Sequence, residues 1–223
     1  VLTVALIGAI LDLPAEAPGL YREVDHRLSE SGVESMVTAV LLNFRAYDTL
    51  LELTVLLVAV LGLGAIRLGS REPLPPVTEI NPVLMAFVRF LSPVMILLAG
   101  YLLWAGGSYA GGAFQAGAVL GAAAILLQIA GILRVGQYRL GIEKTALVLG
   151  VFLFAGIGIA CMVLGGAFLH YPPLQAKQLI LLIEAAGAFS IGATLMLLFA
   201  GRSLADPRDG DTDAPSPDGK GAP

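Results

Sequence analysis

The feature that most constrains this chain is a series of long apolar segments. They cover residues 1–13, 46–68, 83–104, 113–133, 145–169 and 178–200. The last five each have about 20 residues or more, and an α-helix of that length crosses roughly 30 Å of hydrocarbon. Charged residues make up 13 % of the chain, whereas a soluble domain carries about 25 %. The sequence therefore predicts an all-α integral membrane protein with about six transmembrane helices.

The first apolar segment, VLTVALIGAILDL, is short for a transmembrane helix. Two interpretations are open. The sequence AEA follows it, as in a signal peptide, but no basic region precedes its apolar residues. We therefore favour a short first helix over residues 1–13.

The distribution of Lys and Arg predicts how the chain is oriented. With six spans, nine of the 13 basic residues lie on the side that holds both chain ends, and four lie opposite. Because basic loops stay in the cytoplasm, both termini are predicted to be cytoplasmic. Residues 14–45 then face outward, and within them 33–44 form an apolar piece that re-enters the membrane or lies on its surface.

Composition also divides the chain. A Pro-rich stretch, residues 70–82, separates a first module, 1–69, from a four-helix module, 83–200. Residues 201–223 are rich in Asp, Pro and Gly and contain no apolar run, so a disordered tail is expected there.

The patterns GAVLG at 117–121 and AFSIG at 188–192 let helix backbones approach closely, within this bundle or against another protein of a complex.

Three charged residues, Arg45, Asp48 and Glu52, lie inside or at the edge of the second apolar segment. At 100° per residue they fall within about 60° of one another, so they form one polar stripe. Arg45 and Asp48 are spaced for an ion pair, and Asp48 and Glu52 are like-charged neighbours. Two carboxylates this close disfavour simultaneous ionisation. An ionised acid at mid-helix also costs about 2.5–3.5 kcal/mol on insertion scales.

Each of these residues has a structural interpretation beside the functional one. Arg45 and Asp48 either fix a helix end at the membrane surface or tune an ion site. Glu52 either bonds a neighbouring helix or binds a proton or cation, and we favour ion handling. Glu184, in LILLIEAAGAF, is expected to have no basic partner on its own helix. It either faces a cavity or partner, with a role in ion movement, or is protonated and hydrogen-bonded.

Other chemistry has little support in the residues. One Cys excludes an internal disulfide and a Cys-based metal site. The two His residues, His26 and His170, are expected in separate loops without ligand spacing, and the spans contain no axial haem ligand. No nucleophile and base occur together in the spans, so neither a cofactor, a metal nor an enzyme activity is expected.

The segment VTAVLLNFRAYDTLLELTVLLVAVLG resembles the C-terminal end of the A-type component of Mrp-type multisubunit Na⁺/H⁺ antiporters and the matching small component of membrane-bound hydrogenases. The pattern there runs approximately F-R-x-x-D-T-L-x-E-x-T-V-L. It is matched here by Phe44, Arg45, Asp48, Thr49, Leu50, Glu52, Thr54, Val55 and Leu56. The glutamate that the family uses in antiport falls on Glu52.

The segment RFLSPVMILLAGYLLWAGGSYAGGAFQAGAVLGAAAILLQIAG is similar to the first two spans of the B-type component of the same complexes. The loop there reads roughly H-N-x-P-G-G-G-F-x-G-G, and it is matched by Gly111, Gly112, Phe114 and Gly117. Ala110 replaces the usual Pro and Ala113 a Gly. The resemblance covers residues 33–200 and implies that 1–69 is an A-type module, 70–82 a fusion point and 83–200 a B-type module.

The resemblance implies a membrane component of a large assembly related to the membrane arm of respiratory complex I, in a bacterial or archaeal cell membrane. Its partners would be large antiporter-like subunits, small membrane subunits, Na⁺ and H⁺, with no nucleic acid. The chain would then contribute to ion translocation, with Glu52, Asp48, Arg45 and Glu184 as the candidate residues. The alternatives are a purely structural scaffold, or a membrane-arm component of a redox-coupled pump such as a membrane-bound hydrogenase.

Overall fold

The computed structural model describes residues 2–12, 19–67, 82–133, 140–166, 168–172 and 175–200. The tail expected at 201–223, and all but the last residue of the seam expected at 70–82, lie outside these ranges. Every regular element within them is a helix, so the predicted all-α fold is confirmed.

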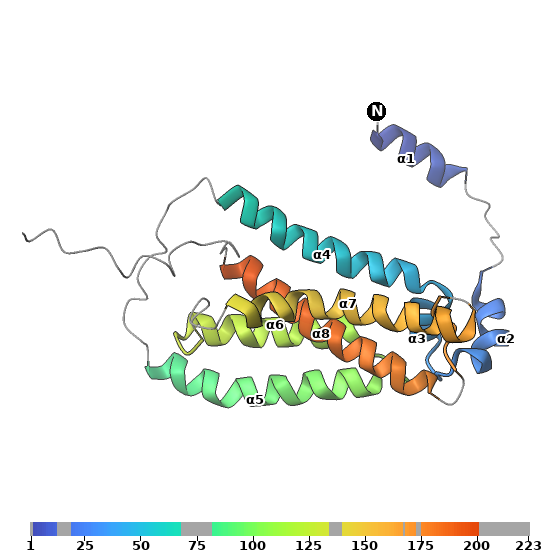
Figure 1. The fold of residues 1–223 in the computed structure, drawn as a ribbon. Helices are drawn as coiled ribbons and strands as arrows, with labels where there is room; N and C mark the ends of the chain where they lie inside the picture. Colours follow the sequence, from blue (N-terminus) through green and yellow to red (C-terminus); the bar gives the residue numbers. More distant parts are fainter. Residues whose placement is uncertain are drawn as a thin grey trace, which may run out of the picture.

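Eight α-helices and one π-helix make up the described part of the chain (Figure 1). They are α1 (Leu2–Leu11), α2 (Tyr21–Ser31), α3 (Met36–Ala39), η1 (Val40–Phe44, the π-helix), α4 (Ala46–Arg67), α5 (Pro82–Ala105), α6 (Ala113–Ile129), α7 (Leu140–Gly165) and α8 (Ala176–Ala200). The five long helices lie lengthwise beside one another, and α2, α3 and η1 cover one end of the bundle.

Helix length decides which elements are able to cross a membrane. Within the described ranges, α4, α5, α7 and α8 are long and apolar enough to do so. Helix α6 has 17 residues and rises about 25 Å. Helix α1 stands apart from the bundle (Figure 1) and has ten residues, so its rise of about 15 Å is roughly half of the hydrocarbon thickness. The chain is therefore a multi-pass membrane protein. The predicted count of about six transmembrane helices includes α1, which is shorter than a full span.

The segment expected to face outward, residues 14–45, contains more helix than hydropathy indicates. His26 lies on α2, so the expectation that it occupies a loop is wrong. Helix α2 ends at Gly32, whose φ of 77° is the left-handed conformation that glycine adopts most easily. The apolar piece 33–44 forms α3 and η1, and it buries Ala39 and Leu42 against the end of the bundle.

Helix α8 is the centre of the molecule. Its apolar stretch is 56 % buried, against 17–28 % for the other three spans, and it packs against α4, α5, α6 and α7. The buried face of α8 carries small residues, among them Gly187, Ala188, Ser190 and Gly192. Small side chains let several neighbouring backbones approach one helix closely.

The contact between α6 and α8 depends on glycine. A Cβ atom on Gly117 would lie 2.7 Å from Ile191 Cβ and 3.0 Å from the Ala188 carbonyl oxygen. A Cβ atom on Gly192 would lie 3.2 Å from Leu120 Cβ on the opposite helix. The two small-residue patterns of the sequence, 117–121 and 188–192, therefore face each other within this chain.

Helix α7 packs against α8 in the same way and adds a hydrogen bond. A Cβ atom on Gly150 would lie 2.8 Å from Ser190 Cβ. Ser190 Oγ donates a hydrogen bond of 2.6 Å to the carbonyl oxygen of Leu147. Both contacts hold α7 against the side of α8 that α6 does not occupy.

The replacement Gly117→Ala tests the α6–α8 contact. The added methyl group overlaps Ile191 and the α8 backbone, and overpacking of this kind costs about 1–3 kcal/mol. We expect a lower midpoint of thermal unfolding for the full chain in lipid nanodiscs, followed by circular dichroism. The matched control is Gly100→Ala on α5, where nothing lies within 4 Å of the added Cβ. Equal midpoints for the two variants would show that the contact is not tight.

Candidate functional site

Glu184 is a buried acid at the centre of the candidate site. Its side chain projects from α8 about 12 Å along the helix from Ala176, and only 4 % of the residue is exposed. The backbone N–H of Ala113, the first residue of α6, donates a hydrogen bond to the carboxyl group. The first N–H groups of a helix have no partner within the helix and form its positive end, which favours a carboxylate. The acid is therefore held at the N-terminus of α6.

The glycine loop between α5 and α6, residues 106–112, makes room for this acid. Gly112 has a φ of 120°, which L side chains rarely adopt, and its added Cβ would lie 3.0 Å from Glu184 Oε1. A Cβ on Gly106 would lie 2.8 Å from Gly112 Cα and 3.3 Å from the same carboxyl oxygen. A Cβ on Gly111 would overlap the carbonyl oxygen of Leu102. Glycine is therefore required at three positions of the loop.

The segment from Glu34 to Thr38 binds the other side of the glycine loop. The backbone N–H groups of Glu34 and Ser35 each donate a 3.1 Å hydrogen bond to the carbonyl oxygen of Gly107. Thr38 Oγ1 donates a short hydrogen bond to the carbonyl oxygen of Gly106. Two consecutive carbonyl groups of the loop are thus bonded by residues that lie far earlier in the sequence.

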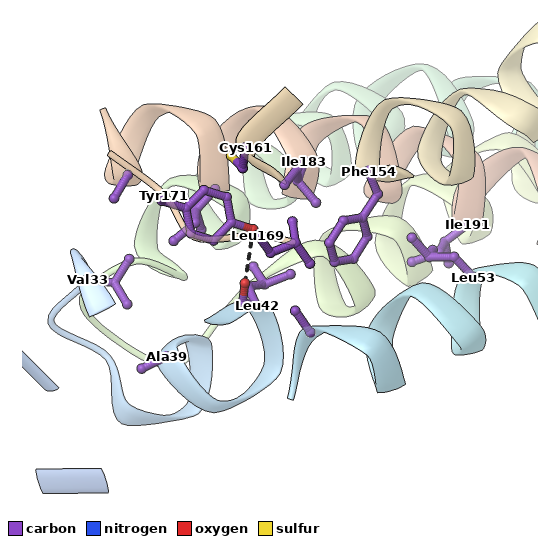
Figure 2. Close-up of a cluster of buried hydrophobic side chains, with 13 residues drawn as sticks. Val33, Ala39, Leu42, Leu53, Phe154, Cys161, Leu169, Tyr171, Ile183 and Ile191 are labelled. Atoms are coloured by element: carbon purple, nitrogen blue, oxygen red, sulfur yellow. Dashed lines mark hydrogen bonds between the residues drawn. The ribbon is translucent and has the colours of Figure 1, made fainter. Parts of the chain in front are cut away.

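Tyr171 joins the connection between α7 and α8 to η1. Its hydroxyl donates a 3.0 Å hydrogen bond to the carbonyl oxygen of Leu42, inside the buried cluster that also contains Leu169 and Ile183 (Figure 2). Burial of the phenol raises the pKa of Tyr171 well above its ordinary value of 10.0. The hydroxyl therefore keeps its proton and acts as a donor across the physiological range.

A cavity of about 130 Å³ leads to the buried acid. Its walls include Ser108 and Tyr109 of the glycine loop, Trp104 of α5, and Lys177 and Glu184 of α8. Lys177 is exposed at the start of α8. Helix α8 begins one residue before Lys177, so this lysine lies on the same helix as Glu184, but no ion pair joins the two side chains.

The charged stripe lies on a different surface. Arg45 and Asp48 form the expected ion pair, with 66 % and 46 % of their side chains exposed, so the pair contributes at most about 1 kcal/mol. Glu52 is exposed on the outer face of α4. The next residue, Leu53, is buried and lies next to Gly187 of α8. The stripe and Glu184 are therefore not brought together.

Glu184 and the glycine motif, by contrast, come together in one site. Gly112 lies beside the acid and Gly111 packs against Leu102 at the end of α5. Phe114 packs against the main buried cluster, and Gly117 contacts α8 one turn further on. The residues that sequence reasoning missed are Gly106, Gly107, Thr38, Tyr171 and Lys177. The extra glycines in WAGGSYAGG were a signal for Gly106 and Gly107. The hydrogen bonds to backbone carbonyl groups have no signature in the sequence.

The fold and the site define a multi-pass, all-helical membrane protein in which Glu184 is buried in the core and Glu52 is exposed on a span. Residues 83–203, just over half of the chain, match the family described as a domain related to the MnhB subunit of Na⁺/H⁺ antiporters. The chain belongs to this family.

Two solved structures have a similar fold. A chain of the Mrp complex from Dietzia sp. DQ12-45-1b matches with a TM-score of 0.69 and 24 % identity. That match covers 96 % of this chain and 25 % of the other, so this chain spans a quarter of that longer one. A chain of the membrane-bound sulfane sulfur reductase, an archaeal respiratory membrane complex, matches with a TM-score of 0.67 and 25 % identity, covering 90 % and 94 % of the two chains. No curated protein sequence matches.

The glycine loop offers a matched pair of variants. Gly106→Ala places a methyl group against the Gly112 backbone and near the Glu184 carboxyl, and we expect a loss of about 1–3 kcal/mol of stability. Gly107→Ala places its methyl group in open space, and we expect a change within about 0.5 kcal/mol. Urea unfolding of the full chain in mild detergent measures both, and a tolerated Gly106→Ala would contradict the described packing.

Proposed function

We propose that this chain is a membrane component of a Na⁺/H⁺ antiporter-type complex and that Glu52 takes part in ion translocation there. Membership of the MnhB-related family supports the kind of complex. The resemblance of the stretch around Glu52 to the A-type component of Mrp antiporters supports the role of the acid. The partners in this proposal are large antiporter-like subunits and small membrane subunits, as the similarity to a chain of the Mrp complex suggests.

The observation that carries the proposal is the position of Glu52. It lies on α4 about 9 Å from the start of the helix at Ala46, in a stretch that is apolar enough to cross a membrane. Its side chain nevertheless points away from the bundle. Among the described residues none forms an ion pair with it. An unpaired acid facing hydrocarbon is costly, so a partner protein or a transported ion is the natural neighbour.

The residues around Glu52 on α4 also favour contact with a partner protein. Leu51 and Val55 are more than half exposed, and Tyr47 is 60 % exposed at the end of the span. This outer face is apolar apart from the acid and the ion pair at the helix end. A partner helix packed here covers the apolar residues and encloses Glu52 between two proteins, where an ion is shielded from lipid.

The proposal extends to the organisation of the chain. We treat the part up to residue 69 as the A-type module and 83–200 as the B-type module, joined at 70–82. Both termini are assigned to the cytoplasmic side from the distribution of Lys and Arg. The first turns of α4 and α8, and the glycine loop, then face the outer side of the membrane.

A second candidate function has one observation in its favour. The match to the sulfane sulfur reductase complex covers nearly the whole of both chains. A membrane-arm component of a redox-coupled pump would use the same fold and the same acids. The composition of the complex purified through this chain decides between them: antiporter-like subunits alone favour the antiporter, and a redox enzyme favours the pump. A complex of this chain with neither would count against both.

The replacement Glu52→Gln tests the translocation role. Loss of a charged contact worth about 1.5–3 kcal/mol is expected to lower Na⁺-dependent H⁺ transport roughly 10- to 100-fold. The measurement is the Na⁺-induced collapse of a proton gradient in vesicles that carry the complete complex. Glu52→Asp keeps the charge and should retain part of the activity.

Glu30→Gln is the matched control, because Glu30 is an exposed acid on α2 outside the candidate spans. We expect it to leave transport unchanged. Native gel electrophoresis establishes that each variant complex is assembled. Full transport by an intact Glu52→Gln complex would leave Glu52 without a role in translocation and would favour a scaffold function.

A further inference from the structure

We propose that Glu184 is a second proton-exchanging site, reached by water from one side of the membrane only, through the cavity beside the glycine loop. The site is distinct from Glu52, which lies on α4 and faces away from the bundle. Proton exchange at Glu184 needs no contribution from Glu52, so each proposal is tested independently of the other.

The cavity follows one face of α8. Four of its lining residues, Lys177, Ile180, Leu181 and Glu184, have the spacing i, i+3, i+4 and i+7 that places side chains on one side of a helix. The face runs about 10 Å from the exposed Lys177 to the buried acid. The path therefore begins at the end of the bundle and stops at Glu184.

The cavity is large and polar enough to hold water. A water molecule occupies about 30 Å³ in the liquid, so a volume of about 130 Å³ accommodates roughly four. The polar lining includes Ser108, Tyr109, Lys177 and the Glu184 carboxyl. Buried waters typically need two to four such partners each, and a chain of them carries a proton between the surface and the acid.

Beyond Glu184 the contacts of α8 with α6 and α4 are tight. The next buried residues along α8, Ala188 and Ile191, pack against α6 at Gly117, where even a methyl group has no space. On α4, Leu53 packs next to Gly187. This packing opposes the passage of water from Glu184 further along α8 between these helices.

The local charges favour a proton over a metal cation. Lys177 stands at the mouth of the cavity, and the positive end of α6 points at the carboxyl group. Both repel a cation, whereas a proton passes along hydrogen-bonded water. Hard cations such as Ca²⁺ take six or more oxygen ligands, and the described residues contain no group of three or more His, Cys, Asp or Glu side chains suited to a metal.

Several titratable groups occur on the elements around Glu184. They are Tyr47, Asp48 and Glu52 on α4, Arg89 and Tyr101 on α5, Lys144 and Cys161 on α7, and Lys177 on α8, together with Glu34, Tyr109, His170 and Tyr171. Of these, Lys177 and Tyr109 line the cavity. Glu184 supplies the carboxyl group among the residues that line the cavity, so a proton exchanged there is assigned to it.

Infrared spectroscopy tests whether Glu184 titrates. The sample is the assembled complex in lipid nanodiscs, recorded while the pH is changed from mildly acidic to mildly alkaline. We expect a carboxylic C=O band that disappears as the pH rises and is absent throughout in Glu184→Gln. The amide oxygen of glutamine still accepts the hydrogen bond from Ala113, so this variant retains the contact. Identical difference spectra for the two proteins would overturn the proposal.

Thiol labelling tests the route of access without altering Glu184. Ser108→Cys places a thiol in the cavity wall, and the native Cys161 is buried. A charged, membrane-impermeant thiol reagent should modify the thiol at position 108 from the α8 N-terminal side only, and the modification should slow the titration of the carboxyl band. Val94→Cys, on the exposed lipid-facing side of α5, should stay unmodified. No modification at 108, or modification from both sides, would overturn one-sided aqueous access.

The same spectra separate this proposal from the role of Glu52. Glu52→Gln should leave the Glu184 band and its titration unchanged, whatever it does to Na⁺-dependent transport. Loss of the Glu184 band in Glu52→Gln would overturn the independence of the two sites.

Discussion

The close approach of α6 to α8 is the contact on which the rest of the structure depends. Gly117 and Gly192 remove the side chains that would hold the two helices apart. With the helices this close, the N-terminus of α6 reaches the Glu184 carboxyl, and the glycine loop before it lies within reach of Glu34, Ser35 and Thr38. In a membrane there is little hydrophobic force between helices, so close packing and polar contacts of this kind largely fix the arrangement.

Polar groups near the Glu184 end of the bundle are bonded in a consistent pattern. The backbone N–H of Ala113 donates to the carboxyl group, and carbonyl groups of the loop and of η1 accept hydrogen bonds from N–H and hydroxyl donors of distant segments. Away from water an unsatisfied polar group costs several kcal/mol. The end of the bundle is therefore specified by hydrogen bonds, whereas its middle is specified by the shapes of small residues.

The long spans and the Arg45–Asp48 pair were accessible from the sequence, because hydropathy and i, i+3 spacing are local properties. Helix α2 was missed because it is amphipathic and polar, and hydropathy carries no signal for it. The surroundings of Glu184 were inaccessible for another reason. They depend on the backbone atoms of Gly106 and Gly107 and on the residue at which α8 begins. Packing between distant segments determines both.

The buried cluster around Phe154 contains residues far apart in the sequence, including Leu42 and Leu53 near its start and Ile183 and Ile191 near its end. Together with the hydrogen bonds of Glu34, Ser35 and Thr38, it holds α3, η1 and α4 against the later helices. These contacts join residues far apart in the sequence, so α2 to α4 are attached to α5 to α8 by packing and hydrogen bonds and not by chain connectivity alone.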